Sequence, residues 1–456
     1  MYDPIRNFKN LMTFFFFSHQ ILQTGTKELV IIILSQDEGD HYLMANVLQQ
    51  NIEDQAANIS SEAPRIDQTN RINMKGSWTI IPILHYLDFT YPNTKWFFFC
   101  IEDIVIDLSK LLTVLSSFNS SQELFIGHAL YDDKPTIIHH FARQKKFKYP
   151  HFGTGFALTS NLLKRISESV RLQPTNDFSI DPAYELADYI FKSQKPVKLT
   201  HVPELCVVAT NSCATYPRVF HPRRKEISLK NIYFAVKTCS MYHNNRIPII
   251  KKTWAKHAVN IGYFSDQSDS NLPEAFVVTN TTKGHCAKTY DILQKVIKIL
   301  ESKNIDWLII SDDDTLFSVA RLMSLLKNYF PKHSIAIGER YGYHVSEPYG
   351  YDYLTGGAGI ILSTPLIYQI LDVCKCPSAS TPDDMFLFGI CLENLRIKPT
   401  HSYLLHQARP VDYATAYLAS QEPISFHKFW EIDPIKVYNQ WFYDADSSLT
   451  KKRTEL

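Results

Sequence analysis

The chain contains the same sequence pattern twice, and this internal repeat constrains the fold more than any other feature. Residues 96–103 form an aromatic and aliphatic run that ends in acidic residues, and residues 307–314 repeat that pattern. Two further matches follow in the same order: residues 124–127 with 335–338, and residues 152–160 with 354–363. The offset of about two hundred residues is much longer than the ~20–50 residues of solenoid repeats, so the pattern predicts a duplicated domain.

Each half alternates strand-like and helix-like segments. In the second half, the apolar patterns predict strands at residues 232–236, 258–264 and 275–279, and helices at residues 246–256 and 290–303. Such alternation predicts an α/β fold with a Rossmann-like, mostly parallel sheet flanked by helices. We expect two of these domains in tandem, at residues 27–222 and 229–450, with the boundary where Pro, Arg and Lys interrupt the apolar pattern.

An acidic triplet marks the end of one buried strand. The apolar residues 307–310 run through Ser311 into Asp312, Asp313 and Asp314. Ligands of open α/β sheets bind beyond the carboxyl ends of the strands, which is where these side chains fall. Adjacent carboxylates repel one another, but their oxygens together suit Mg²⁺ or Mn²⁺ with a phosphate-bearing ligand. The alternative is an acidic loop or a helix N-cap.

Composition argues against one class of partner and limits the number of disulfides. The formal net charge of +1 argues against a nucleic-acid partner, which would need a basic surplus. Eight cysteines are too few for a disulfide framework in 456 residues. They fit either buried free thiols or a few disulfides in a secretory protein.

Both ends of the chain carry compartment signals. Residues 1–26 are a candidate signal segment, because Arg6 and Lys9 precede the apolar residues 11–17. An incorrectly assigned start or an ordinary apolar turn are the alternatives. No later segment reaches the ~18 apolar residues of a membrane span, so we expect membrane contact at most through this N-terminal segment.

The other end is a retrieval-like tail at residues 451–456. Its last four residues, 453–456, are similar to the Lys-Asp-Glu-Leu address that a retrieval receptor reads. Glycosylation sequons begin at Asn58, Asn119 and Asn280. These signals together predict a protein of the endoplasmic reticulum lumen, in the secretory pathway, with that receptor as a partner.

Seven motifs of the second half carry a family resemblance. They stand in order at residues 234–238, 246–254, 263–266, 307–314, 356–359, 382–385 and 425–427. Together they resemble the Fringe-related β-1,3-glycosyltransferases. The resemblance implies a GT-A fold, a UDP-sugar donor held through Mn²⁺, and inversion at the anomeric carbon. With its tandem layout and its tail, the whole chain resembles one member of this family, and that resemblance implies transfer of glucose from UDP-glucose to the 3-hydroxyl of O-linked fucose on thrombospondin type 1 repeats.

The catalytic residue is expected in the Pro-Asp-Asp motif. Inversion requires one base to take the proton of the acceptor hydroxyl as the bond to UDP breaks. Asp384 matches the base position of the family, and Asp383 is the second candidate. Pro382 can open a helix here, so the alternative is that both carboxylates only cap that helix.

The resemblance also assigns ligand-binding residues. Asp312, Asp314 and His427 match the metal ligands of the family, and Asp313 is expected nearer the ribose of the donor. The candidate contacts for uridine and phosphate are Thr238, Arg246 and Asp266. Gly357, within the glycine-rich residues 356–359, would let the backbone approach donor or acceptor closely, the alternative being a tight turn.

The first half lacks several of the candidate catalytic and metal-binding residues. Alignment of the repeats places Asp103 opposite Asp314, but Ile101 opposite Asp312 and Pro182 opposite Asp384. We therefore expect a non-catalytic domain that recognises the acceptor protein or braces the structure. The alternatives for the whole chain are a related β-1,3-galactosyl- or N-acetylglucosaminyl-transferase, a non-enzymatic luminal lectin or chaperone, and a metal-dependent phosphoesterase.

Overall fold

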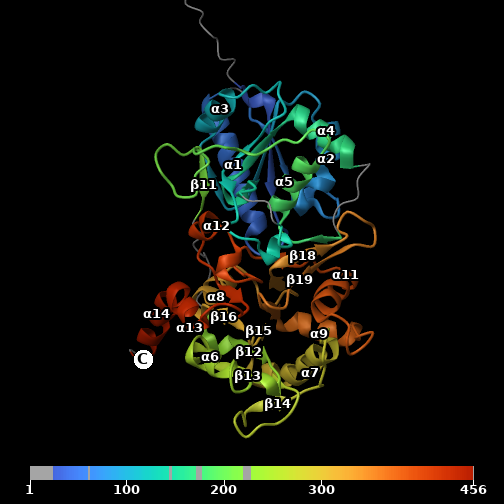
Figure 1. Cartoon of the computed structure of the whole chain (residues 1–456), viewed down its shortest axis with the longest axis vertical. Coiled ribbons are helices and arrows are strands. Elements are labelled where there is room, and N and C mark those ends of the chain that lie inside the picture. Colours follow the sequence, from blue (N-terminus) through green and yellow to red (C-terminus); the bar gives the residue numbers. More distant parts are fainter. Residues whose placement is uncertain (1–23, 60–61, 143–145, 171–176, 219–226, 455–456) are drawn as a thin grey trace, which may run out of the picture.

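The computed structural model describes residues 24–59, 62–142, 146–170, 177–218 and 227–454, with side chains described to residue 449. Most of the candidate signal segment and the last two residues of the retrieval-like tail lie outside these residues. The described chain forms two α/β halves, one above the other in Figure 1. Within the described part, no helix is both long and apolar enough to cross a membrane.

The sheet of the first half has the strand order β2-β1-β3-β8-β5-β10. The bounds are β1 Leu29–Leu34, β2 Arg65–Gln68, β3 Trp96–Ile101, β5 Phe125–Gly127, β8 Phe156–Thr159 and β10 Thr200–His201. The central strands β1 and β3 consist of aliphatic and aromatic residues, apart from one cysteine, and are buried along their whole length. Continuous apolar strands of this kind are typical of sheets covered by helices on both faces.

The sheet of the second half repeats this order. Its strands run β14-β13-β12-β15-β20-β17-β21, so that β13, β12, β15, β20, β17 and β21 take the places of β2, β1, β3, β8, β5 and β10. The bounds are β12 Ile232–Lys237, β13 Asn260–Ser265, β14 Ala275–Val277, β15 Trp307–Asp312, β17 Ala336–Gly338, β20 Ile360–Ser363 and β21 Thr400–His401. The predicted tandem α/β fold is therefore confirmed.

Each sheet is mostly parallel but contains one reversed strand at the same place. The strand β8 is antiparallel to β3 and β5, and β20 is antiparallel to β15 and β17. A small antiparallel pair also recurs: β4 (Ile104–Ile106) with β11 (Thr215–Pro217), and β16 (Thr315–Phe317) with β22 (Ser425–His427). The duplication thus extends from sequence motifs to strand pairing.

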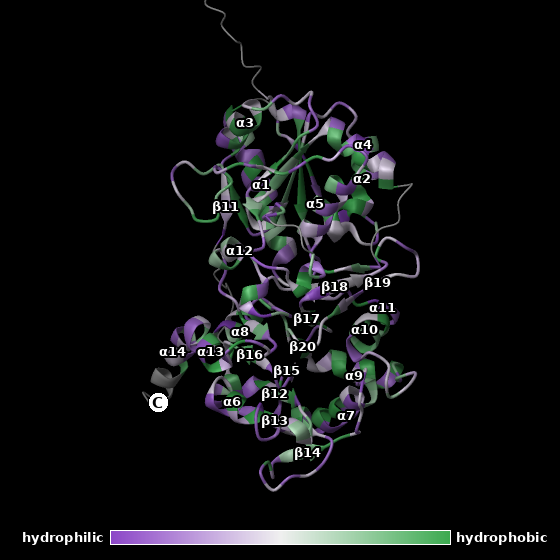
Figure 2. Cartoon of the chain, in the orientation of Figure 1, coloured by the Kyte–Doolittle hydropathy of each residue, from purple (hydrophilic) through white to green (hydrophobic). Residues whose placement is uncertain are grey.

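Helices flank the sheets, and Figure 2 shows apolar (green) and polar (purple) residues mixed along them. The first half contributes α1 His41–Ile59, α2 Leu84–Thr90, α3 Leu108–Ser116, α4 Ser160–Val170 and α5 Pro182–Lys192. The second contributes α6 Ile247–Lys252, α7 Cys286–Lys303, α8 Val319–Leu326, α9 Thr364–Val373, α10 Asp383–Met385, α11 Cys391–Asn394, α12 Thr415–Ala419, α13 Pro434–Trp441 and α14 Tyr443–Thr454. The backbone of residues 451–454 continues α14.

The two halves share secondary structure where they meet. The strands β18 (Arg340–Tyr343) and β19 (Tyr351–Leu354) of the second half are joined by β9 (Phe178–Ser179) of the first. In addition, the Trp78 indole donates a hydrogen bond to Asp352 at 3.0 Å. Figure 1 shows α12, β18 and β19 in this middle region. The arrangement of the halves is therefore fixed by backbone pairing as well as side-chain contacts.

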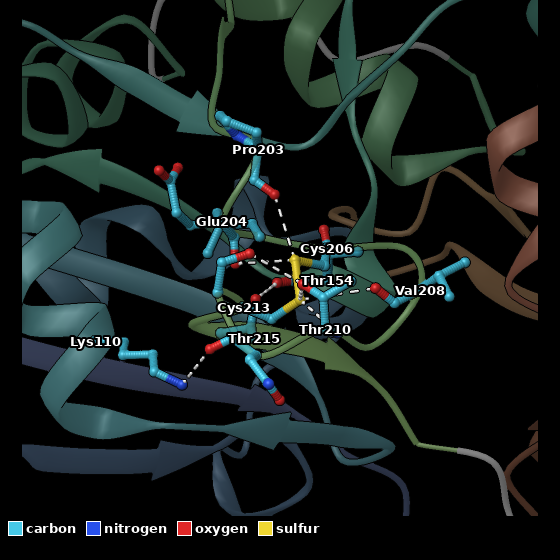
Figure 3. The surroundings of a disulfide bond; sticks show 12 residues. Lys110, Thr154, Pro203, Glu204, Cys206, Val208, Thr210, Cys213 and Thr215 are labelled. Carbon is cyan, nitrogen blue, oxygen red and sulfur yellow. Dashed lines mark hydrogen bonds between the residues drawn. A yellow bond between two sulfur atoms is a disulfide. The ribbon is translucent and has the colours of Figure 1, made fainter.

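The cysteines form disulfides in both halves. Cys206 pairs with Cys213 in the first half (Figure 3), while Cys286 pairs with Cys376 and Cys374 with Cys391 in the second. Next to the first of these bonds, the Thr215 hydroxyl donates to the Thr154 carbonyl, which holds β11 onto the glycine-rich segment before β8. Cys100 and Cys239 remain as thiols.

Candidate active site

The acidic triplet lies at the carboxyl end of β15, as predicted, and the fold brings a histidine to it. The register of β16 and β22 places Thr315 opposite His427, and Thr315 directly follows Asp314. One side-chain atom from each of Asp312, Asp314 and His427 lies within 4.8 Å of the other two. Two carboxylates and an imidazole at this separation form a candidate metal-binding group.

The environment of His427 fixes which ring nitrogen faces the carboxylates. Its Nδ1–H donates to the Gln407 carbonyl at 3.0 Å, whereas Nε2 lies 3.1 Å from Asp314 Oδ1 and 3.7 Å from Asp312 Oδ2. Engagement of Nδ1 by a carbonyl leaves the Nε2 lone pair for a metal, as in many metal-binding histidines.

Gly357 makes room for the imidazole. A Cβ atom at this position would stand 2.2 Å from His427 Nδ1, which is far inside van der Waals contact. The close approach made by Gly357 is thus to His427 in the described structure, and this observation supplies a physical reason for a glycine at residue 357.

Two basic side chains form ion pairs with the three carboxylates of the triplet. Lys237, at the end of β12, places Nζ 3.2 Å from Asp312 Oδ1, and Arg246 places one guanidinium nitrogen 2.7 Å from Asp313 and 3.1 Å from Asp314. Burial raises the pKa of Asp312, but the charge and hydrogen bond of Lys237 together with the charges of His427 and His285 outweigh burial, so the net pKa is lowered. Asp312 is therefore held as an anion, the form that binds a cation.

The candidate donor contacts gather at the ends of β12, β13 and β15. Asp313 accepts a hydrogen bond from the Thr238 hydroxyl at 2.7 Å and one from Arg246, whose guanidinium lies 3.8 Å from the centre of the Tyr242 ring. Burial raises the pKa of Asp313 to about 6. Thr238, Arg246 and Asp313 therefore form one connected group beside the metal-type residues.

Asp266 follows β13 but lies in a different set of contacts. Its carboxylate accepts hydrogen bonds from the Ser240 backbone N–H at 2.7 Å and from the Ser240 hydroxyl at 3.1 Å. These contacts fix the turn at Ser240–Tyr242 that carries Tyr242 toward Arg246. In the described structure, Asp266 thus shapes the wall of the site through this turn.

The two candidate bases have different surroundings. Asp383 is buried, and its Oδ2 accepts hydrogen bonds from Lys237 Nζ at 2.9 Å and from the Thr289 hydroxyl. Asp384 is partly exposed, and its Oδ1 accepts only the N–H of Met385, at 2.8 Å, among the described hydrogen bonds. Burial and the charge of Asp383 raise the pKa of Asp384 to about 6. Asp384 is therefore the better placed proton acceptor, while Asp383 is held by its neighbours.

Lys237 joins the two parts of the site. Its ammonium contacts Asp312 and Asp383, and Asp383 in turn accepts the backbone N–H of Asp384 at 3.0 Å. This role was missed in the sequence, although Lys237 belongs to the motif at residues 234–238. The signal was present, because a lysine at the end of a buried strand needs anionic partners. The role of Gln407 carries no such signal, because any residue has a carbonyl.

The counterpart residues of the first half are arranged differently. Asp181 caps α5 and contacts His139 at 2.9 Å, while Glu102 contacts His41. Among the described residues of this half, no group of His, Cys, Asp and Glu has metal-binding separation. The first half also contains a Phe-His pair, Phe220 and His221, that matches Phe426 and His427 in the second half. This pair lies outside the described residues.

Ligands of a doubly wound sheet bind at the carboxyl ends of its strands. Here that edge carries two carboxylates with a histidine from β22, and further carboxylates beside them, a set suited to metal-assisted group transfer. The sequence model of the Fringe-like family matches residues 35–208 and 227–450. The chain therefore belongs to the Fringe-like family, with one match in each half.

Curated relatives include two that align with nearly the whole chain. The beta-1,3-glucosyltransferases of Mus musculus and Homo sapiens are each 41% identical over 439 residues, covering 94% of this chain and 89% and 88% of theirs. The beta-1,3-N-acetylglucosaminyltransferase lunatic fringe of Danio rerio is 26% identical over 210 residues, 41% of this chain and 56% of that protein. The resemblance inferred from the seven motifs is confirmed.

Proposed function

We propose that the second half is an inverting glycosyltransferase that moves glucose from UDP-glucose to the 3-hydroxyl of O-linked fucose on thrombospondin type 1 repeats. The product would carry a β-1,3 linkage. One observation supports the proposal most directly. Lys237 links the Asp312, Asp314 and His427 group to the Asp383–Asp384 motif, because its ammonium contacts both Asp312 and Asp383. The 41% identity to two beta-1,3-glucosyltransferases supports the choice of donor and linkage.

The residues present fit a divalent metal, and Mn²⁺ is the ion we propose. The test is the donor set: two carboxylates suit a hard cation, while the Nε2 of His427, which faces these carboxylates, adds an imidazole, a combination that Mn²⁺ accepts. Asp312, Asp314 and His427 would hold it. When bound, the ion would offset negative charge on the departing diphosphate.

The remaining chemistry belongs to side chains of this chain. Asp384 accepts the proton of the fucose 3-hydroxyl while the new O3–C1 bond forms and the bond from C1 to the diphosphate oxygen breaks. UDP leaves with the bonding electron pair, so a single displacement inverts the anomeric carbon. Lys237 and Thr289 hold Asp383, whose contact with the backbone of Asp384 fixes the direction of the base. Thr238, Arg246 and Asp313 are the proposed donor contacts.

We assign the first half a non-catalytic role in acceptor recognition or bracing. We also propose that the protein works in the endoplasmic reticulum lumen, held there by a retrieval receptor that reads residues 451–456. The three sequon asparagines Asn58, Asn119 and Asn280 are exposed, as glycosylation requires, and this exposure supports the proposed location in the secretory pathway. Membrane contact would be limited to the N-terminal segment.

A donor screen tests the proposal. UDP-glucose, UDP-galactose and UDP-N-acetylglucosamine are each incubated with a fucosylated thrombospondin repeat and Mn²⁺, and the product is identified by mass spectrometry and linkage analysis. We expect transfer from UDP-glucose only, with none from the Asp314→Asn variant. Transfer from another donor would favour a different transferase of the family, and absence of transfer and of UDP-glucose hydrolysis would favour a lectin or chaperone.

A further inference from the structure

A cavity of about 500 Å³ lies between the two halves, away from the candidate active site. The first half contributes the carboxyl ends of β1 and β3, and the second contributes β18, residues 401–404 and α12. This volume is within the range of small-molecule binding sites in proteins. Its most exposed lining residues are Arg218, Ser324, Ala419 and Glu422, which mark where it meets solvent.

The cavity occupies the first half's counterpart of the active site. The strands β1 and β3 take the places of β12 and β15, and both Asp103 and Asp181 line the cavity. The edge of the sheet that binds ligands in α/β proteins is thus retained, and the second half covers it. A site that only braced the halves would be expected to be filled by side chains at the density of a protein interior.

The polar groups of the wall are incompletely paired. Several lining residues each have a buried side-chain atom that contacts no hydrogen-bonding partner among the described residues: Asp103 Oδ1, His151 Nδ1, Arg321 Nε, Asn328 Oδ1 and Arg340 Nε. Buried polar atoms are nearly always hydrogen-bonded in native proteins. Five residues with such groups border this one cavity, so its otherwise largely apolar lining includes polar side chains at several points, as a ligand with hydroxyl groups requires.

The charge of the wall narrows the ligand class. Guanidinium groups come from Arg218, Arg321 and Arg340, and carboxyl groups from Asp40, Asp103, Asp181, Glu339 and Glu422. Burial raises the pKa of Asp103 to about 7 and that of Glu339 to about 8. Carboxyl groups outnumber guanidinium groups in the wall, so it offers no surplus of positive charge to a diphosphate and favours a neutral ligand.

Aromatic rings complete the lining. Trp78, Tyr149, Phe152, Tyr413 and Tyr417 border the cavity together with the polar groups. Rings offer flat apolar surface to the C–H faces of a pyranose, while carboxyl, amide and guanidinium groups bond its hydroxyls. We propose that this interdomain cavity is a second ligand site, which binds a neutral carbohydrate of one or two sugar units.

Ligand-observed saturation-transfer NMR tests this proposal on the full chain. The probes are D-glucose, L-fucose and glucosyl-β-1,3-fucose, measured without metal or UDP-glucose so that donor chemistry does not contribute. We expect saturable binding of at least one probe. Ala419→Trp, which narrows the mouth, and Asn328→Leu, which removes a wall amide, should each weaken it by about tenfold or more, the effect of losing one good hydrogen bond or its access.

Two controls make the result specific. Thr415 is also exposed on α12 but does not line the cavity, so Thr415→Trp should bind the probes as the unmodified protein does. Asp314→Asn should bind them equally well, because it changes only the candidate active site. Absence of binding by all probes, binding unchanged by both wall variants, or loss of binding in Asp314→Asn would each overturn the proposal. None of these outcomes depends on whether the enzyme transfers glucose.

Discussion

At the scale of single residues, Asp383 and Asp384 show how neighbours divide one acidic motif between two roles. Lys237 and Thr289 occupy the Asp383 carboxylate, so a proton from an acceptor would not be taken up there readily. Asp384 keeps more of its oxygen surface available and has a raised pKa, as expected of a general base. The family resemblance placed Asp384 first and Asp383 second, and the packing supplies a physical reason for that order.

The first prediction concerns Asp384→Asn. The amide preserves side-chain size and leaves an oxygen for Met385 N–H, so the fold and UDP binding should be retained. Loss of the base should lower kcat by roughly 10²–10⁴-fold with little change in donor KM. Steady-state kinetics, melting temperature and UDP binding on one preparation check this outcome. A helix cap without catalytic function would instead cost about 1 kcal/mol of stability and spare turnover.

The pKa of Asp384 also predicts a pH dependence. Burial and the Asp383 charge raise this pKa to about 6, and a base acts only when ionised. The logarithm of kcat should therefore rise with unit slope below pH 6 and level off above it. A pH–rate profile measured over the range in which the protein stays folded checks the position of this limb. A flat profile between pH 5 and 7 would assign the proton transfer to another group.

Gly357→Ala is predicted to disturb the metal-type group. The added Cβ would stand 2.2 Å from His427 Nδ1, so the imidazole must leave the Gln407 carbonyl or lose its aim at Asp314. Mn²⁺ affinity, measured by electron paramagnetic resonance, should fall by about 10–100-fold, as when an orienting contact is lost. Gly356→Ala is the matched control, since its Cβ would meet only Lys237 Nζ at 3.8 Å.

At the scale of elements, a disulfide supports the loop that carries the candidate base. Cys286 begins α7 and pairs with Cys376, and its N–H donates to the Thr381 carbonyl at 3.1 Å. Residues 382–384 follow directly. The base is therefore positioned by a covalent link between the start of α7 and the segment before α10.

We predict that the double variant Cys286→Ser, Cys376→Ser loses both stability and turnover. The bond closes a span of 90 residues, for which loop entropy gives about 4.6 kcal/mol. Chemical denaturation and kcat at a temperature where the variant is folded measure the two effects. The Cys206→Ser, Cys213→Ser variant is the control: its span is 7 residues, so about 2 kcal/mol is expected, with kcat unchanged.

The predicted elements were correct where the local pattern decides the structure. Tandem sheets, the strand ending at Asp312 and the helix at residues 290–303, which lies within α7, were all predicted from apolar periodicity. The predicted helix at residues 246–256 was wrong in its extent, because α6 stops at Lys252. Beyond it, Trp254 is buried and its indole donates to the Thr315 carbonyl at 3.0 Å, a tertiary contact that sequence pattern does not contain.

The sequence motifs named the candidate site residues, but they did not predict the contacts between those residues. The motifs named Asp312, Asp314 and His427, and the fold brings them within 4.8 Å. The orientation of His427 depends on a backbone carbonyl at Gln407 and on space left by Gly357. Both depend on the approach of segments distant in sequence. The cavity between the halves likewise arises from lining residues that share no motif.

At the scale of the whole molecule, the proposed compartment rests on the retrieval-like tail. From residues 453–456 we predict that their removal diverts the protein from cells to the medium, because a retrieval receptor would no longer read the tail. Immunoblots of cell extract and medium measure the distribution. Replacing residues 453–456 by Lys-Asp-Glu-Leu should keep the protein inside, and unchanged retention of the truncated chain would show that the tail is not an address.

The pairing of β9 with β18 imposes an order on biogenesis. Phe178 pairs with Tyr343, a residue that the ribosome adds 165 positions later (343 − 178). At about 5–20 residues per second, the emerging first half waits on the order of ten seconds for the strand that completes it. During this interval β9 has no partner strand and the end of the first half's sheet is uncovered, and exposed surfaces of this kind favour misassembly and aggregation until they are covered. Substitutions in the β18–β19 hairpin should therefore reduce the yield of enzyme before they reduce its specific activity.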